Sequence, residues 1–184
     1  MIIIIIILLA FVAPNASVIG EVLMLDQSSV WYGAVVRGDK SKVKIGAVSS
    51  IQDRAVITTV SKLDSGFPSD VDIGDYVTVG QGAVLTSCVI GHKVSIGAGA
   101  IIQEGVVVEQ NSIVAAGSVV LADTLIPSGQ LWAGNPAKYI RDISEEEGQN
   151  FEKVAEQTSL LASEHAEEFL PYGTVYQEAE KLTK

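Results

Sequence analysis

Histidine and cysteine, the side chains that most often bind zinc, are scarce in this chain. His92 and His165 are its two histidines, and Cys88 is its single cysteine. A catalytic zinc needs three protein ligands and an open position for a water molecule whose pKa falls to about 7. Two histidines cannot supply three imidazoles, so one copy of this chain is not expected to assemble a three-histidine zinc site.

Each of these three residues also has an ordinary structural interpretation. His92 lies in the segment Ile90-Gly91-His92-Lys93, which is typical of a solvated turn. His165 is expected to be a surface or packing residue of a helix near the C-terminus. Cys88 is expected to be a small buried apolar residue. A single cysteine excludes an internal disulfide and is compatible with a reducing compartment.

The composition narrows both the fold and the partners. The residues are 48% hydrophobic but only 6% aromatic, and 17 are glycine, which favours narrow, regularly turning β structure. The net charge is −10 and the isoelectric point is near 4.5. Because a phosphate backbone would be repelled by this charge, nucleic acid is not expected as a partner.

The elements that would position any site follow a period of six residues, at which an aliphatic side chain recurs. Six is neither the helical nor the strand period, so each recurrence indicates one flat of a larger coil, with three hexads per triangular turn. Glycine often follows the aliphatic residue, where we expect a bend that needs a permissive backbone. Three runs carry the period: Ile90, Ile96, Ile102, Val108, Val114, Val120, Ile126 and Trp132; Val12, Val18, Met24, Val30 and Val36, then Ile45, Ile51 and Ile57; and Ile73, Val79 and Leu85.

The period therefore predicts an all-β solenoid, a parallel β-helix over residues 11–140. It fails between residues 58 and 71, which we expect to form an excursion loop, and it slips at residues 37–44, where a smaller protrusion is expected. The turn Gly134-Asn135-Pro136 ends the repeats. Ser144, with Glu147 three residues later, indicates the start of an amphipathic helix.

That helix is assigned to residues 141–171 and is expected to lay an apolar face along the solenoid. The residues that recur at helical spacing are Phe151, Val154, Ala155, Leu161, Ala162 and Phe169. Residues 172–184 form a polar tail without a clear signal. Residues 1–10 form an apolar segment too short to span a bilayer, which takes about 20 residues, and without the flanks of a signal peptide. Its isoleucine run is of uncertain identity, and no function is drawn from it.

Five motifs resemble the γ-class carbonic anhydrase family, in family order and with insertions in the family's places. They are Phe11-Val12-Ala13-Pro14, Val30-Trp31-Tyr32-Gly33, Val36-Arg37-Gly38-Asp39, Ile51-Gln52-Asp53 and Trp132-Ala133-Gly134-Asn135-Pro136-Ala137. The resemblance implies a left-handed β-helix and a trimer. It also implies a zinc between two subunits, with two histidines from one subunit and one from its neighbour.

At the positions that match the family's three histidines, this chain has Thr58, Gln81 and Thr86. Hydroxyl and amide groups are neutral and bind zinc poorly. The resemblance places Arg37 and Asp39 near the subunit interface, and Gln52 and Asp53 close to the metal position. Together these four are interpreted as a retained interface network, or, for Arg37 and Asp39, as residues that hold the neighbouring loop.

Residues 17–22, 105–109 and 114–117, with the C-terminal helix, most resemble the γ-carbonic anhydrase and anhydrase-like subunits of mitochondrial complex I in plants, algae and protists. The resemblance implies a non-catalytic structural subunit in a heterotrimer with two other γ-carbonic anhydrase-type chains. It would contact membrane-arm subunits of complex I, peripheral to the matrix side of the inner membrane. Zinc is then expected only at an interface between partner subunits, and no cofactor is expected on this chain alone.

Two alternatives stay open at this point. One is a free homotrimer that binds a small molecule at the degenerate sites. The other is an enzyme, either a zinc carbonic anhydrase or a related hexapeptide acyltransferase. The acyltransferases commonly use a catalytic histidine at a subunit interface, and neither His92 nor His165 lies in such a sequence context.

Overall fold

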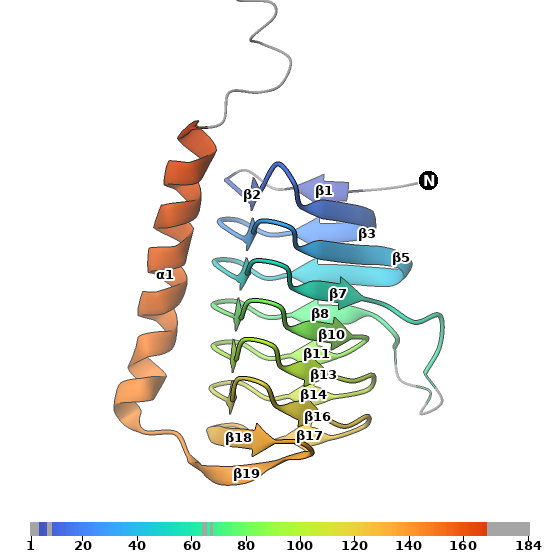
Figure 1. Ribbon diagram of the computed structural model, residues 1–184, viewed down its shortest axis with the longest axis vertical. Helices are drawn as coiled ribbons and strands as arrows, with labels where there is room; N and C mark the ends of the chain where they lie inside the picture. Colours follow the sequence, from blue (N-terminus) through green and yellow to red (C-terminus); the bar gives the residue numbers. More distant parts are fainter. Residues whose placement is uncertain (1–3, 7–8, 64–65, 67, 169–184) are drawn as a thin grey trace, which may run out of the picture.

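The computed structural model describes residues 4–6, 9–63, 66 and 68–168. Figure 1 shows a stack of short parallel strands wound into a coil, with one helix alongside it. This arrangement confirms the predicted parallel β-helix with a C-terminal helix. Its left-handed sense stays a prediction from the resemblance. None of the described helices combines the length and apolar character that crossing a bilayer requires.

The coil has three faces, each a column of strands in which every strand pairs with the strand one turn away. The helix face consists of β2 (Phe11–Val12), β4 (Ser29–Val30), β6 (Ser50–Ile51), β9 (Thr78–Val79), β12 (Ser95–Ile96), β15 (Ile113–Val114) and β18 (Gln130–Gly134). The middle face consists of the first halves of β3 (Ser17–Met24) and β5 (Val35–Ile45), then β7 (Val56–Thr58), β10 (Val84–Thr86), β13 (Ile101–Ile102) and β16 (Val119–Val120). The third face consists of β1 (Ile4–Ile6), the second halves of β3 and β5, then β8 (Val71–Ile73), β11 (Val89–Ile90), β14 (Val107–Val108) and β17 (Leu125–Ile126).

The core is the set of aliphatic side chains at the six-residue positions. Val12 pairs with Val30 on the next turn, and Ile96 pairs with Val114, as three hexads per turn require. Ile51, Ile57 and the other central members of the runs have no exposed surface. Each buried Val or Ile contributes about 1.5–3 kcal/mol, so this ladder is the main source of stability.

The glycines that follow these aliphatic residues are needed for a different reason from the one expected. Gly46 and Gly74 do not have positive φ; that conformation is adopted two residues later, by Val48 and Tyr76. A Cβ at Gly46 would collide with the backbone carbonyl of Gly74 on the next turn. Close approach of stacked turns, rather than a left-handed bend, therefore requires glycine here.

The two interruptions of the period differ in structure. The smaller protrusion expected at residues 37–44 is present as a bulge within β5: residues 39–42 lie opposite Glu21 alone, between the register pairs Gly20–Gly38 and Val22–Val43. The strand continues through this bulge, so the extra residues do not form a separate loop. The loop after β7 has neither helix nor strand among its described residues, and Leu63 within it is buried.

The solenoid ends where β18 turns back. The Gly134-Asn135-Pro136 turn leads into β19 (Ala137–Asp142), which pairs with β18 in the antiparallel sense and so stops the parallel stacking. Helix α1 (Glu145–Glu168) follows and lies along the helix face (Figure 1), where it contacts β2, β6 and β9.

The face that α1 buries is narrower than the sequence suggested. Phe151, Ala155 and Ala162 are buried, and Ser159 is buried between them. Val154 and Leu161, which we expected on the same face, are 46% and 45% exposed. The other expected member, Phe169, lies outside the described residues, as do residues 169–171 of the assigned helix and the polar tail.

The first turn of α1 has the predicted capping box. The Ser144 amide donates to Oε2 of Glu147 at 3.0 Å, and the Glu147 amide donates to Ser144 Oγ at 3.3 Å. Arg141 adds two hydrogen bonds to the same carboxylate, both of 2.7 Å. The hydrogen bonds from Arg141 and then from the Ser144 amide lower the pKa of Glu147 to about 2.

This carboxylate should make the start of α1 sensitive to acid. Because the pKa of Glu147 is lower in the folded chain, its contribution to stability is fully present above the ordinary glutamate pKa and is lost as the pH falls toward about 2. We expect the protection of amides in the first turn of α1, taken relative to their intrinsic exchange rate at each pH, to fall over this interval. Glu147→Gln should already exchange fast at neutral pH, whereas Glu146→Gln should behave like the unmodified chain. Equal exchange in both variants would show that the cap does not hold the helix start.

Candidate functional site

The two threonines at the ligand positions lie side by side at one edge of the middle face. Thr58 ends β7 and Thr86 ends β10, and the two are register partners on adjacent turns. Arg37 is the register partner of Thr58 on the other side. All three follow inward-pointing core residues, so their side chains point out of the coil. This column, Arg37, Thr58 and Thr86 with the neighbouring Asp39, is called the threonine edge below.

Arg37 and Asp39 form a closed pair on this edge. Nη2 of Arg37 lies 2.6 Å from Oδ2 of Asp39, and both side chains are substantially exposed to solvent. The hydrogen bond from Arg37 lowers the pKa of the Asp39 carboxyl. An exposed pair of this kind contributes little to stability by itself. Its geometry suits it to hold the bend of β5 or to meet a second chain.

Gln81 lies at the opposite edge of the middle face, in the turn between β9 and β10. Gln52 and Asp53 occupy the equivalent turn between β6 and β7. Asp53 fastens its turn on both sides: its Oδ1 accepts from the Tyr32 amide at 3.1 Å, and its carbonyl accepts from the Gly82 amide at 2.8 Å. This set, Gln52, Asp53 and Gln81, is called the glutamine edge below.

A polar hollow of about 630 Å³ opens at the glutamine edge. It is lined by Asn15, Tyr32, Gly33, Asp53, Arg54, Gln81 and Gly82. The threonine edge does not line this hollow, because a whole strand of the middle face separates the two edges. One chain therefore brings Thr58 and Thr86 together but does not bring Gln81 to them. Among the described residues, no group of three histidine, cysteine, aspartate or glutamate side chains could hold a metal ion.

His165 is a packing residue, and it connects α1 to the glutamine edge. Its Nδ1 lies 2.8 Å from the hydroxyl of Tyr32, which lines the polar hollow. The imidazole also meets the rings of Trp31 and Phe11 edge to face, with ring centroids 5.3 and 6.3 Å away. Sequence reasoning missed this cluster because the six-residue period does not encode how the helix is placed along the coil.

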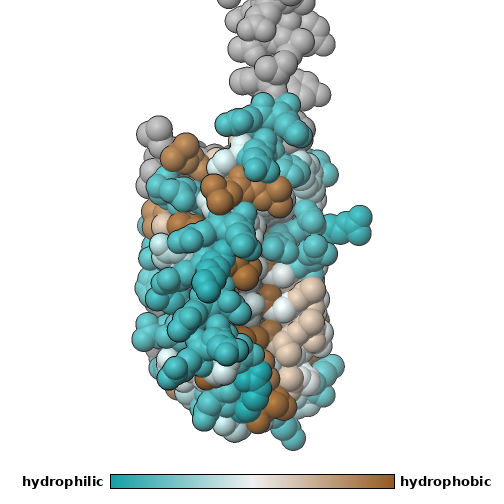
Figure 2. All heavy atoms as spheres, turned by 90° about the vertical axis from the view of Figure 1, so that its left-hand side faces the viewer, coloured by the Kyte–Doolittle hydropathy of each residue, from teal (hydrophilic) through white to brown (hydrophobic). Residues whose placement is uncertain are grey.

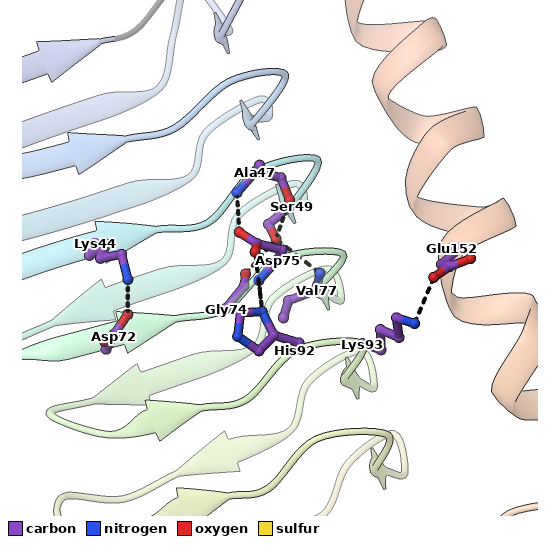
Figure 3. Close-up of polar contacts among 10 residues, drawn as sticks. All are labelled: Lys44, Ala47, Ser49, Asp72, Gly74, Asp75, Val77, His92, Lys93 and Glu152. Atoms are coloured by element: carbon purple, nitrogen blue, oxygen red, sulfur yellow. Dashed lines mark hydrogen bonds and ion pairs between the residues drawn. The ribbon is translucent and has the colours of Figure 1, made fainter.

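His92 organises the stacking of turns at the corner between the third face and the helix face (Figure 3). Its Nδ1 accepts the amide of Asp75 at 2.9 Å. The Asp75 carboxylate lies 3.3 Å from the same nitrogen. The other Asp75 oxygen accepts from the Ala47 amide at 2.7 Å. His92 thus holds one turn against the next.

The same corner is fastened to the helix. Figure 3 shows Lys93, next to His92, reaching Glu152 of α1 with Nζ 2.7 Å from the carboxylate. Ser49 donates to the Gly74 carbonyl at 2.7 Å and accepts from the Val77 amide at 2.9 Å, which satisfies a buried hydroxyl. These contacts join the stacked turns to one another and to α1.

Cys88 behaves as the sequence suggested. It is free and buried next to the third face. Burial raises the pKa of its thiol to about 12. Since the thiolate is the reactive form, Cys88 is not a candidate nucleophile.

Comparison with known proteins places the chain among hexapeptide-repeat proteins. A family model described as bacterial transferase hexapeptide (six repeats) matches residues 87–122. Gamma carbonic anhydrase-like 1, mitochondrial, from Arabidopsis thaliana is 45% identical over 175 residues, which are 95% of this chain and 69% of that protein. A crystal structure of a hexapeptide transferase family protein from Anaplasma phagocytophilum superposes with a TM-score of 0.80 at 37% identity, covering 87% of this chain and 91% of the other.

A second Arabidopsis thaliana relative is named as an anhydrase without the suffix "like". Gamma carbonic anhydrase 1, mitochondrial, is 45% identical over 159 residues, which are 86% of this chain. The chain spans 58% of that relative's length. The identities to the two relatives are equal, so overall identity does not decide between the relative named an anhydrase and the one named anhydrase-like.

The contact between Tyr32 and His165 should help to dock the end of α1. Tyr32→Phe removes the hydroxyl and is expected to lower the free energy of unfolding by about 0.5–1.5 kcal/mol, with faster amide exchange in the last turns of α1. Tyr139→Phe is the matched control, because the Tyr139 hydroxyl donates to exposed Asp142 at 3.1 Å, far from this cluster. If both variants lose equal stability, the aromatic cluster does not anchor the helix.

Proposed function

Because the chain belongs to the gamma carbonic anhydrase family, we propose that it serves as a non-catalytic scaffold subunit of a heterotrimer. Its partners would be two other γ-carbonic anhydrase-type chains. The assembly would lie on the matrix side of the mitochondrial inner membrane, against the membrane arm of complex I. The mitochondrial names of the Arabidopsis relatives and the motif resemblance support this location.

The proposal rests on one observation: the three ligand positions are divided between two edges of the middle face, and that face keeps its regular strands. The threonine and glutamine edges lie on opposite borders of the middle face, so only a neighbouring chain can bring one edge to the other. Head-to-tail contacts that repeat this pairing form a closed trimer when successive chains are related by a rotation of a third of a turn. The positions that would then meet hold Thr58, Gln81 and Thr86, which are poor ligands for zinc.

The middle face has a surface suited to such a contact. Between the two edges runs an outward column of aliphatic side chains, in register from turn to turn: Val35, Val56, Val84, Ile101 and Val119. Ile101 is 40% exposed and the valines are half-buried. Burying this column between subunits would remove apolar surface from water, which favours association.

The trimer would hold at most one zinc. Each interface takes ligands from both of its chains, and this chain takes part in two of the three interfaces. Only the interface between the two partner subunits could retain a complete ligand set. This chain would therefore contribute contact surfaces to the trimer and no zinc ligands.

The metal content of the purified chain tests the non-catalytic part of the proposal. We expect elemental analysis to find zinc far below one ion per interface and no measurable CO₂ hydration. Thr58→His/Gln81→His/Thr86→His should gain zinc, with Zn–N distances of about 2.0–2.1 Å by X-ray absorption. Stoichiometric zinc with activity in the unmodified chain would overturn the proposal.

The proposed interface can be tested separately. The chain is co-expressed with a zinc-ligating relative, and the amount of trimer recovered is measured. Ile101→Asp places a charge in the aliphatic column and is expected to reduce this amount at least tenfold. The reason is that an unpaired charge would be buried at the contact. Leu125→Asp is the control, since Leu125 is 55% exposed and so at least as accessible as Ile101, but lies on the third face. Native mass spectrometry gives the composition. Recovery solely as a homotrimer would contradict the heterotrimer.

A further inference from the structure

Helix α1 carries most of the net negative charge of the chain. Its 24 residues include eight glutamates and one lysine, so it accounts for seven of the ten net negative charges. Surface helices usually gain stability from opposite charges three or four residues apart. Here Glu164 and Glu168 are instead like charges at that spacing, which is destabilising.

Only two of these glutamates have ion-pair partners within the part of the chain that the structure describes. Glu147 pairs with Arg141, and Glu152 pairs with Lys93. The other six are exposed and have no ion pair with any described residue: Glu145, Glu146, Glu156, Glu164, Glu167 and Glu168.

Apolar side chains lie among these charges on the side turned away from the solenoid. Leu160 is 67% exposed, with Glu156 one turn before it and Glu164 one turn after it. Leu161, beside it, is 45% exposed. Figure 2 looks onto this helix and shows apolar surface amid hydrophilic surface toward its C-terminal end. We call Leu160 and Leu161, with Glu156 and Glu164, the outer face of α1.

The outer face is exposed, and no other part of the chain that the structure describes covers Leu160. The opposite stripe, at Phe151, Ala155 and Ala162, is already packed on the solenoid. The Lys93 and Tyr32 contacts described above hold α1 near both of its ends. A partner would therefore meet a preformed helix surface, which lowers the entropic cost of binding.

We propose that the outer face of α1 docks a basic amphipathic segment of a partner protein. Apolar residues of that segment would cover Leu160 and Leu161, while its lysines or arginines would neutralise the unpaired glutamates. The negative charge of the outer face favours this partner over two others, a second copy of the chain and an anionic lipid surface. A second copy would bring glutamate against glutamate, and an anionic lipid surface would be repelled. The proposal is independent of the trimer, because the outer face is separate from the middle face.

Binding of a synthetic helical peptide of leucine and lysine to the full chain tests this, measured by fluorescence anisotropy. We expect Leu160→Ser/Leu161→Ser to weaken binding at least tenfold. Glu156→Gln/Glu164→Gln should weaken it and flatten its dependence on salt. Both pairs are exposed, so circular dichroism should show an unchanged fold. Leu125→Ser, at a 55% exposed leucine on the third face, should bind like the unmodified chain.

A second peptide with the same lysines but serine in place of leucine separates docking from plain charge attraction. It should bind at least tenfold more weakly than the leucine peptide. Equal binding of both peptides, or equal effects of the Leu125 and Leu160/Leu161 variants, would overturn the proposal. So would binding of the chain to anionic lipid vesicles through Leu160 and Leu161, or self-association that the same variant abolishes.

Discussion

The stacking of one aliphatic side chain per six residues is the interaction on which every other feature of this molecule depends. Ile51, Ile57 and Ile73 have no exposed surface, and each lies above its counterpart on the next turn. Because the turns must stay in register for these side chains to stack, extra residues are accepted only where they leave the register intact. The lengthened β5 and the loop after β7 both meet this condition, since the strands on either side of them still pair.

The same constraint explains how a site can be lost while its scaffold is kept. Thr58 follows Ile57, and Thr86 follows Leu85; the aliphatic residue of each pair points into the core and the threonine points out. The outward positions contribute little to the stacking, so histidine can be replaced there at small cost to the fold. Selection for the fold would keep the inward residues, and selection for contact with neighbouring chains would keep the Arg37–Asp39 pair and the aliphatic column of the middle face. That is the combination present in this chain.

The sequence could predict features that repeat along the chain or depend on neighbouring residues. It could not predict features that depend on how distant parts of the chain pack together. The six-residue runs predicted the core and the strand columns, and Ser144 with Glu147 predicted the start of α1. By contrast, nothing in the period says which residues of α1 meet the coil, so Val154 and Leu161 were wrongly assigned to the buried face. The contact between His165 and Tyr32 was missed for the same reason. The glycines after the aliphatic residues were found correctly, but their cause, the approach of the Gly74 carbonyl to Gly46, needed the stacked turns to be seen.

The most direct measurement is the composition of the assembly recovered when the chain is tagged in its own cells and purified in mild detergent. If the chain acts as a structural scaffold, the variant Thr58→Ala/Gln81→Ala/Thr86→Ala should still co-purify with two other γ-carbonic anhydrase-type chains and with membrane-arm subunits, in unchanged amounts. Loss of those partners in this variant would show that the three polar positions themselves are required. Recovery of the unmodified chain without such partners would contradict the scaffold role altogether.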